Sequence, residues 1–320
     1  MDEFALIREF FTKLAPHGGD VVLGIGDDAA ILAVPAPWQL AVCTDTLVAG
    51  HHFPLDTVPA DIGWKALAVN LSDLAAMGAV PRWFTLALTL PVAEAGWLAG
   101  FTQGLAALAQ KQSVALVGGD TTRGPLSVTV TAGGWVEPGT ALRRSGAQVG
   151  DVVCVTGTLG DAALALRCLT PPSGAKACPP ALRARLDRPT PRVGAGRVLR
   201  EHAHAAIDIS DGLAADLGHI LAASGVGAML QAEALPRSAA FSACASADAQ
   251  ALQLHGGDDY ELCACLPPAA VAAAQAGCAQ AGVALTVIGE VVAERGLWID
   301  TAGVRSPCPP RGFDHFAVEA

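Results

Sequence analysis

The chain has 320 residues, of which 52% are hydrophobic and 16% are charged, and its formal net charge is −10. A chain of this length exceeds one typical core, so we expect two domains, and its apolar content excludes a largely disordered protein. The acidic balance argues against a nucleic-acid partner, because such binding depends on Lys and Arg neutralising phosphates.

The chain contains no run of about 18 uncharged apolar residues, and its first residues are acidic where a signal peptide would be basic. We therefore expect a cytoplasmic protein that does not enter a membrane. The nine cysteines are scattered, and the closest pair, Cys263 and Cys265, lacks the spacing of a zinc site. We interpret them as reduced thiols.

The first half of the chain predicts strands and helices in alternation. Apolar runs bounded by turn residues predict strands at 21–25, 40–44, 83–90, 114–117 and 127–136. Helical spacing of apolar residues predicts helices over 2–14, 61–77 and 92–112. Two of the strands end next to a carboxylate, at Gly26-Asp27-Asp28 and at Asp45. Open α/β sheets place their ligand sites at such strand ends.

The stretch 137–150 contains Pro, Gly and an Arg pair and predicts the domain boundary, which divides residues 1–140 from 141–320. The second half restarts with a predicted strand at 152–156. A further strand at 205–209 leads into Ser210-Asp211-Gly212 and a helix. The continued alternation indicates an α/β or α+β fold.

Six short acidic motifs, each beside glycine or a hydroxyl residue, recur along the chain: 26–28, 44–46, 72–73, 119–122, 208–212 and 257–259. Each alone is an ordinary turn or helix cap. Together they would place several carboxylates where only four lysines are available as partners. Divalent cations such as Mg2+ would satisfy such a set and could hold a polyphosphate.

The usual phosphate-binding signatures, the Walker loop and the protein-kinase motifs, do not occur in the sequence. A phosphate site here must therefore use aspartates, metal ions, arginines and backbone amides. The helix after Ser210-Asp211-Gly212 would offer N–H groups to an anion, and Ser210 or Asp211 could also cap it. A zinc hydrolase is not supported, because no His-x-x-x-His pair occurs with Glu on a helix.

With these residues in place, the chain resembles the thiamine-monophosphate kinase family, within the superfamily of aminoimidazole ribonucleotide synthetase, selenophosphate synthetase and a hydrogenase maturation factor. The matching segments run in the expected order over nearly the whole chain: 24–30, 44–53, 64–78, 118–122, 188–192, 207–212 and 256–262. His52-Phe53 and the Gly-Gly-Asp-Asp-Tyr sequence at 256–260 favour the kinase over its relatives.

The resemblance implies ATP-dependent phosphorylation of thiamine monophosphate to thiamine diphosphate, the last step of thiamine diphosphate synthesis, by direct in-line transfer assisted by several Mg2+ ions. The metal ligands would be Asp28, Thr44, Asp45, Asp73, Asp120, Asp208 and Asp211, and Asp73, Asp208 and Asp211 would be catalytic. ATP would contact Gly119, Asp120, Arg144 and Ser210. The substrate would contact His52, Glu261 and Phe313.

The resemblance also implies a two-domain synthetase-like fold, in which the N-terminal sheets of two chains form a barrel across a homodimer. The C-terminal α/β domain would complete the active site. Two positions depart from the family pattern. Cys43 stands where relatives often have Ser or Thr, and Gln103 lies near where they place an aromatic side chain against adenine.

Two alternative functions remain open. The first is an ATP-dependent synthetase of the same superfamily that activates an amide or selenide. The second is a nucleotide-binding maturation or scaffold protein without turnover. The residues 316–320 lack the C-terminal cysteine of the maturation factor, which counts against the second alternative.

Overall fold

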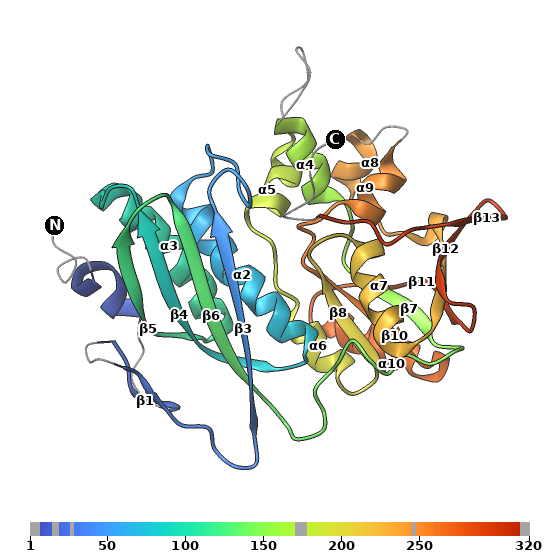
Figure 1. Cartoon of the computed structure of the whole chain (residues 1–320), viewed down its shortest axis with the longest axis horizontal. Coiled ribbons are helices and arrows are strands. Elements are labelled where there is room, and N and C mark those ends of the chain that lie inside the picture. Colours follow the sequence, from blue (N-terminus) through green and yellow to red (C-terminus); the bar gives the residue numbers. More distant parts are fainter. Residues whose placement is uncertain (1–6, 15–18, 26–28, 170–177, 245–247, 314–320) are drawn as a thin grey trace. The chain divides into compact units, whose positions relative to one another are not determined.

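The computed structural model describes residues 7–14, 19–25, 29–169, 178–244 and 248–313. The chain has a mixed α/β architecture and divides into two compact units (Figure 1). The first unit comprises Met1–Leu74 and Ala79–Gly139, and the second comprises Ala75–Gly78 and Thr140–Ala320. The division at Gly139 falls in the stretch that contains Pro138 and Gly139, where a chain turns easily.

The first unit is built on a four-stranded sheet with the order β3-β6-β4-β5. Its strands are β3 (Gln39–Val48), β4 (Val80–Leu90), β5 (Ala115–Arg123) and β6 (Ser127–Val136). The pairs β3–β6 and β4–β6 are antiparallel, whereas β4 and β5 are parallel. The helices α2 (Pro59–Ala76) and α3 (Ala95–Gln112) lie on one face of this sheet (Figure 1).

The two helices of the first unit approach each other at glycines. A Cβ added to Gly104 of α3 would lie 1.7 Å from the carbonyl oxygen of Ala60, and one added to Gly63 of α2 would lie 2.1 Å from that of Phe101. Only glycine allows two backbones to come so close. The buried leucines around this crossing, among them Leu67 and Leu105, form the core between helices and sheet.

Shorter elements precede the sheet, and they differ from the expectation. The described part of the predicted helix over 2–14 is a π-helical turn, η1 (Ile7–Phe11), followed by a 3-10 turn, η2 (Thr12–Leu14). The predicted strand at 21–25 is shorter: β1 (Val21–Leu23) pairs with β2 (Ile31–Leu32) in a sheet of two strands. Asp27 and Asp28 lie outside the described residues.

Two predicted strand ends were wrong in the first unit. β3 continues past Asp45 to Val48, because it pairs with β6 along its whole length. Thr44 and Thr46 bond across to Thr131 and Thr129 through their hydroxyl groups, at 2.9 and 2.8 Å, which supports the continued ladder. The predicted turn at 118–122 is likewise part of β5, paired with β4 after a register shift at Thr85.

The second unit is built on a seven-stranded sheet with the order β13-β12-β9-β11-β7-β10-β8. The strands are β7 (Val152–Thr156), β8 (Ala205–Ile209), β9 (Gly227–Gln231), β10 (Glu261–Leu266), β11 (Leu285–Val292), β12 (Gly296–Thr301) and β13 (Val304–Pro307). Neighbours are antiparallel except β9 and β12. β7 and β8 have the bounds predicted from their apolar runs.

Helices cover both faces of this sheet. On β7, Val153 and Val155 pack into one core with α7 (Leu213–Ser224), whereas Cys154 packs into another with α6 (Val193–Leu199) and α10 (Val271–Gln280). This alternation follows from the two-residue period of a strand. The helices α4 (Asp161–Leu169), α5 (Pro180–Asp187) and α8 (Ala239–Cys244) share a smaller core around Phe241. The remaining elements are α9 (Ala249–His255), η3 (Ala232–Ala234) and η4 (Pro268–Ala270).

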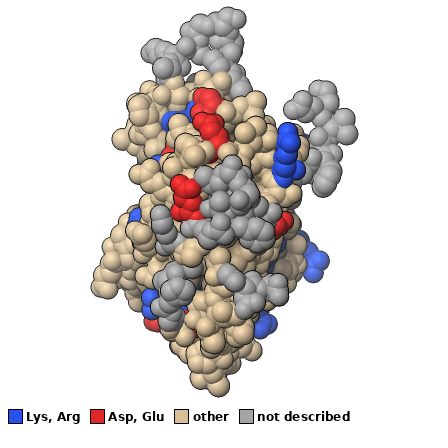
Figure 2. Space-filling model, turned by 90° about the vertical axis from the view of Figure 1, so that its left-hand side faces the viewer, with Lys and Arg blue, Asp and Glu red and all other residues tan. Residues whose placement is uncertain are grey.

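Charged side chains are sparse on the surface. On the face drawn in Figure 2, acidic and basic residues form small separate groups within a mostly uncharged surface, consistent with a charged content of 16%. No helix in the part of the chain that the structure describes is long and apolar enough to cross a membrane.

Candidate active site

In the first unit, Asn70 of α2 connects the helix to β3. The side chain of Asn70 is fully buried; its Oδ1 accepts the N–H of Asp45 at 3.2 Å, and its Nδ2 donates to the carbonyl of Ala66 at 3.1 Å. The thiol of Cys43 donates to the carbonyl of Asn70 at 3.3 Å. A buried polar group held by several partners fixes its neighbours in place. Asn70 therefore sets how β3 presents Cys43 and Asp45.

Asp45 and Asp73 gather around the Cys43 thiol. Burial raises the pKa of Cys43, and the negative charges of Asp73 and then Asp45 raise it further. Two carboxylates predicted from separate motifs are thus brought together by β3 and α2. Thr44 differs, because successive side chains of a strand point to opposite faces: its hydroxyl meets Thr131 on the other face of the sheet.

Gly119 and Asp120 lie on β5, beside a cavity of about 580 Å3 that is contained in the first unit. Much of its wall is apolar and includes Phe11, Ile25, Leu86 and Leu116. A Cβ on Gly119 would lie 1.9 Å from the carbonyl oxygen of Leu86, so the strand can pass β4 here only as glycine.

His52 is held in the turn that follows β3. Its Nδ1 accepts the N–H of Val48 at 3.0 Å, which assigns the proton of a neutral imidazole to Nε2. Its carbonyl accepts a hydrogen bond at 3.0 Å from Nζ of Lys65, a lysine that is 1% exposed. The fixed tautomer makes His52 a hydrogen-bond donor at Nε2.

In the second unit, Asp208 is the penultimate residue of β8, and Ser210 and Asp211 form the loop before α7. The sequence predicts that the amides of this loop are open to an anion. This prediction was wrong, because the amides are occupied by a side chain of the protein. The N–H groups of Ser210, Asp211 and Gly212 all donate to Oδ2 of Asp216, at 3.0, 3.1 and 3.1 Å. The N-cap is Gly212, which has no capping side chain, so the carboxylate of the first helical turn supplies the acceptor.

Three carboxylates lie close together at this loop. Burial raises the pKa of Asp216 to about 7, and the charges of Asp208 and then Asp211 add to the effect, although the amide donors lower it. Asp208 of β8 and Asp211 of the loop are therefore each close enough to Asp216 to raise its pKa. Within the described ranges, no three histidine, cysteine or acidic side chains are arranged to hold a metal ion.

The acidic motif at 257–259 packs against the acidic motif at 208–212. The N–H of Asp258 donates to the carbonyl of Ser210, and that of Tyr260 to the carbonyl of Ile209, both at 2.8 Å. Asp258 and Tyr260 both adopt positive φ, at 66° and 49°, and the Tyr260 hydroxyl donates to Oδ1 of Asp258 at 3.1 Å. Residues other than glycine rarely adopt a positive φ, so the contacts of this segment hold it in an unfavourable backbone conformation.

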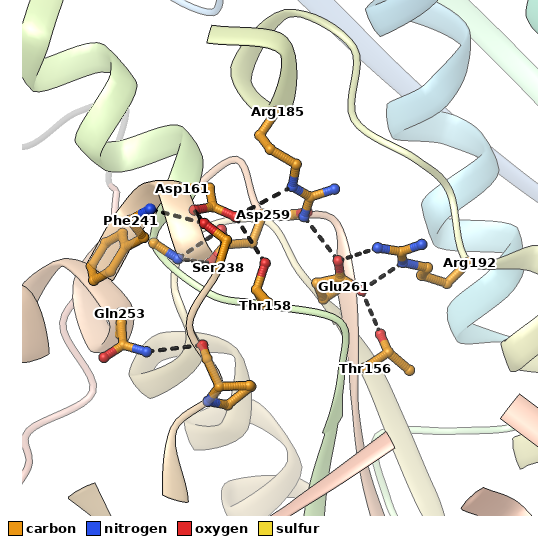
Figure 3. Close-up of polar contacts among 12 residues, drawn as sticks. Thr156, Thr158, Asp161, Arg185, Arg192, Ser238, Phe241, Gln253, Asp259 and Glu261 are labelled. Carbon is orange, nitrogen blue, oxygen red and sulfur yellow. Dashed lines mark hydrogen bonds and ion pairs between the residues drawn. The ribbon is translucent and has the colours of Figure 1, made fainter. Parts of the chain in front are cut away.

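Glu261, the next residue, is fully buried in a network of polar groups (Figure 3). Its carboxylate accepts from Nε of Arg192 at 2.6 Å, from Nη2 of Arg192, from Nη2 of Arg185 at 2.8 Å and from Oγ1 of Thr156 at 2.7 Å. A Cβ on Gly157 would lie 2.2 Å from Oε1 of Glu261. A direct contact between Glu261 and a substrate would therefore require it to give up one of these partners.

The same network extends to two buried aspartates (Figure 3). Asp161 accepts from the hydroxyls of Thr158 at 2.8 Å and Ser238 at 2.6 Å, and Nε of Arg185 lies 3.8 Å from it. Asp259 accepts the N–H of Gly160 at 3.0 Å, and burial raises its pKa well above the usual range. Nη2 of Arg185 also donates to the carbonyl of Asp259 at 3.2 Å, so Arg185 of α5 connects all three acidic residues, whereas Arg192 contacts Glu261.

The two remaining predicted residues lie on connecting segments. Arg144 is exposed, and its carbonyl accepts from the hydroxyl of Ser224 at the end of α7, at 3.3 Å. Phe313 is 53% exposed, and its N–H donates to the carbonyl of Asp211 at 3.1 Å. The structure therefore brings Phe313 to the same loop as Asp211.

Local sequence patterns did not indicate three groups: in the first unit Asn70 as the link between β3 and α2, and in the second Asp216 as the acceptor for the loop amides and the arginines around Glu261. An aspartate in the first turn of a helix is a signal that could have indicated Asp216. The arginine contacts to Glu261 join residues 69 and 76 positions apart, which no local pattern reveals.

The chain is similar to known proteins over nearly its whole length. The chain matches the family described as AIR synthase related protein, with the N-terminal domain over residues 26–136 and the C-terminal domain over 148–300. The thiamine-monophosphate kinase of Salmonella typhimurium is 48% identical, over 99% of this chain and 98% of that protein. The chain belongs to the thiamine-monophosphate kinase family.

Solved structures agree with this assignment. The crystal structure of thiamine-monophosphate kinase from Stenotrophomonas maltophilia K279a superposes with a TM-score of 0.86 at 51% identity, and covers 94% of this chain and 97% of that one. The structure of AaThiL complexed with AMPPCP and TMP superposes with a TM-score of 0.76 at 31% identity, over 98% and 97% of the two chains.

Proposed function

We propose that this chain transfers the γ-phosphoryl group of ATP to the phosphate of thiamine monophosphate and so forms thiamine diphosphate and ADP. The observation that carries the proposal is the 48% identity to a thiamine-monophosphate kinase over 99% of the chain. The complex of AaThiL with AMPPCP and TMP supports the choice of both substrates, since AMPPCP is an analogue of ATP.

Both substrates are anionic, so charge repulsion is the main barrier to the reaction. We infer that Mg2+ ions supply the opposing charge, held by Asp28, Asp45, Asp73, Asp120, Asp208 and Asp211. The Thr44 hydroxyl meets Thr131 on the other face of the sheet, so any assistance from Thr44 would come from its backbone carbonyl. The donor chemistry fits, because Mg2+ prefers carboxylate oxygens. The pairing of Asp45 with Asp73 around Cys43, and of Asp208 with Asp211, supports this inference, since paired like charges favour binding of a cation.

The nucleotide site is inferred to include Gly119 and Asp120, with Arg144 and Ser210 contacting phosphates. The cavity beside β5 supports the nucleotide assignment: its volume of about 580 Å3 suits a nucleotide-sized ligand, and its apolar wall suits a base. Arg144 is exposed, and its guanidinium carries a permanent charge with planar donors suited to phosphate.

For thiamine monophosphate, we propose that His52 donates from Nε2 and that Phe313 stacks against the cationic heterocycle. The exposed ring of Phe313 and the fixed tautomer of His52 support these roles. Glu261 is proposed to shape the substrate pocket as the anchor of Arg185 and Arg192, because its carboxylate is already engaged by both arginines.

We also propose that the enzyme is a cytoplasmic homodimer in which the four-stranded sheets of two chains pair into a barrel. In support, β3 is an edge strand of its sheet, and Leu40 and Val42 on it are 43% and 54% exposed. Exposed apolar side chains on a sheet are typical of an interface. A solution mass of one chain at micromolar concentration would contradict the dimer.

The reaction is tested with purified protein, ATP, Mg2+ and thiamine monophosphate, by measuring thiamine diphosphate and ADP separately. We expect the two products in equal amounts, and no turnover when EDTA removes divalent cations. ADP formed only with an acceptor other than thiamine monophosphate would reject the proposal and favour a synthetase.

A further inference from the structure

Asp216 organises the backbone of the loop between β8 and α7. Its side chain is buried, with 3% of the residue exposed, and a single oxygen, Oδ2, accepts the N–H groups of three consecutive residues, Ser210, Asp211 and Gly212. Three successive N–H groups that converge on one point form a concavity of the kind that binds anions in many proteins. In this chain, the concavity is filled by the protein's own carboxylate.

The carbonyl side of the same loop is also held. The carbonyl of Ser210 accepts from the N–H of Asp258, and that of Asp211 accepts from the N–H of Phe313. Gly212 has a φ of +119°, and a Cβ there would lie 2.9 Å from the carbonyl carbon of His255, so the backbone has no room to shift in that direction. The amides and carbonyls of the loop are thus fixed by different segments.

These contacts determine where the side chains of Ser210 and Asp211 leave the backbone. The amide hydrogen bonds to Asp216 fix the orientation of the peptide planes on both sides of each Cα, and the Cα–Cβ direction follows from these planes. The amides themselves are already used, so they cannot bind a phosphate without displacing the carboxylate.

We propose that Asp216 is a positioning residue of the phosphoryl-transfer site, which holds the backbone of 210–212 so that Ser210 and Asp211 point at the ligands that they bind. This inference rests on the proposed function. It deepens that function by assigning the contacts: in this loop, the side chains of Ser210 and Asp211 bind phosphate and metal, and the three amides do not.

The experiment compares Asp216→Ala, which removes the acceptor, and Asp216→Asn, which keeps a neutral acceptor of the same size, with the wild-type enzyme. The matched control is Asp151→Asn. Asp151 is also 3% exposed in the second unit, and its Oδ2 also accepts a backbone N–H, that of Gln148 at 2.9 Å. Asp151 is not among the residues that we assign to the site. Each variant is tested for folding by circular dichroism.

Two readouts are taken on each folded variant. The first is hydrogen exchange of the amides of 210–212 without substrates, which we expect to be faster in both Asp216 variants than in the wild type. The second is kcat together with the Mg2+ concentration for half-maximal rate. We expect Asp216→Ala to lower kcat by about 10- to 100-fold and to raise the Mg2+ requirement, with Asp216→Asn intermediate. Asp151→Asn should change kcat and the Mg2+ concentration for half-maximal rate by no more than about 2-fold each.

The outcomes distinguish a positioning role of Asp216 from a general loss of stability, and they distinguish failure of this inference from failure of the proposed function. Asp216→Asn with wild-type exchange and an unchanged Mg2+ requirement would overturn the proposal, as would equal losses in the Asp216 and Asp151 variants. If Asp216→Ala does not fold, the Asn variant decides. A wild-type enzyme without turnover of thiamine monophosphate would reject the proposed function, whereas the exchange readout would still report whether Asp216 holds the loop.

Discussion

Arg192 donates two hydrogen bonds, from Nε and Nη2, to the carboxylate of Glu261. These bonds connect the segment before α6 to the first residue of β10. Glu261 is fully buried, whereas the side chain of Arg192 is 16% exposed. A buried charge of this kind is tolerated only with partners that replace its hydration.

Arg192→Ala is therefore expected to lower the free energy of unfolding by about 3 kcal/mol, because it removes two donors from a buried carboxylate. Urea unfolding measures the change. The control is Arg167→Ala, which breaks a surface pair with Asp248 whose side chains are 37% and 54% exposed. This pair should contribute at most about 0.5 kcal/mol. If Arg192→Ala lowered the free energy of unfolding no more than Arg167→Ala does, the buried charge of Glu261 would not need Arg192 for its stabilisation.

Asp73→Asn and Asp208→Asn are each expected to lower kcat by about 10²- to 10³-fold, while both proteins stay folded. Each change removes a carboxylate that we propose holds Mg2+ beside the transferring phosphate. Steady-state kinetics with thiamine monophosphate and circular dichroism provide the measurement. Asp248→Asn, a change in an exposed surface pair, should keep the wild-type rate. Full activity in the two site variants would make those carboxylates structural.

The stability of the protein in EDTA should fall as the pH rises through 7, because of Asp216. Its pKa in the folded protein is about 7, above the usual value of 3.8, so between these values the folded state binds more protons than the unfolded state. The contribution is favourable at low pH and lost as the carboxylate ionises. Relative to Asp216→Asn, the wild type should lose about 2 kcal/mol between pH 5 and pH 8. Parallel pH curves of the two proteins would contradict this.

His52→Asn should raise the KM for thiamine monophosphate and leave the free energy of unfolding nearly unchanged. An asparagine Oδ1 can accept the N–H of Val48 in place of Nδ1, whereas the donor at Nε2 is lost. Kinetics at saturating ATP measure the effect. His51→Asn, at the exposed neighbouring position, is the control and should leave the KM unchanged. An unchanged KM in His52→Asn would remove His52 from the substrate site.

Local sequence patterns predicted the strands that are bounded by turns. β6, β7 and β8 have the expected ends, because an apolar or alternating run and the flanking turn residues agree there. The patterns were wrong where pairing with a neighbour extends a strand across a polar motif, as in β3 beyond Asp45 and β5 through Asp120. Ladder hydrogen bonds with a distant strand outweighed the turn preference of Gly and Asp.

The ordered acidic motifs, the scarcity of lysine and the family to which the motifs belong can all be read from the amino-acid order. How these residues are used depends on the packing of distant segments. This packing engages Glu261 with Arg185 and Arg192 and directs Asp216 at the amides that a phosphate was expected to occupy. The physical reason is that a buried carboxylate must find donors, and the donors that lie within reach depend on the packing of segments far apart in the chain.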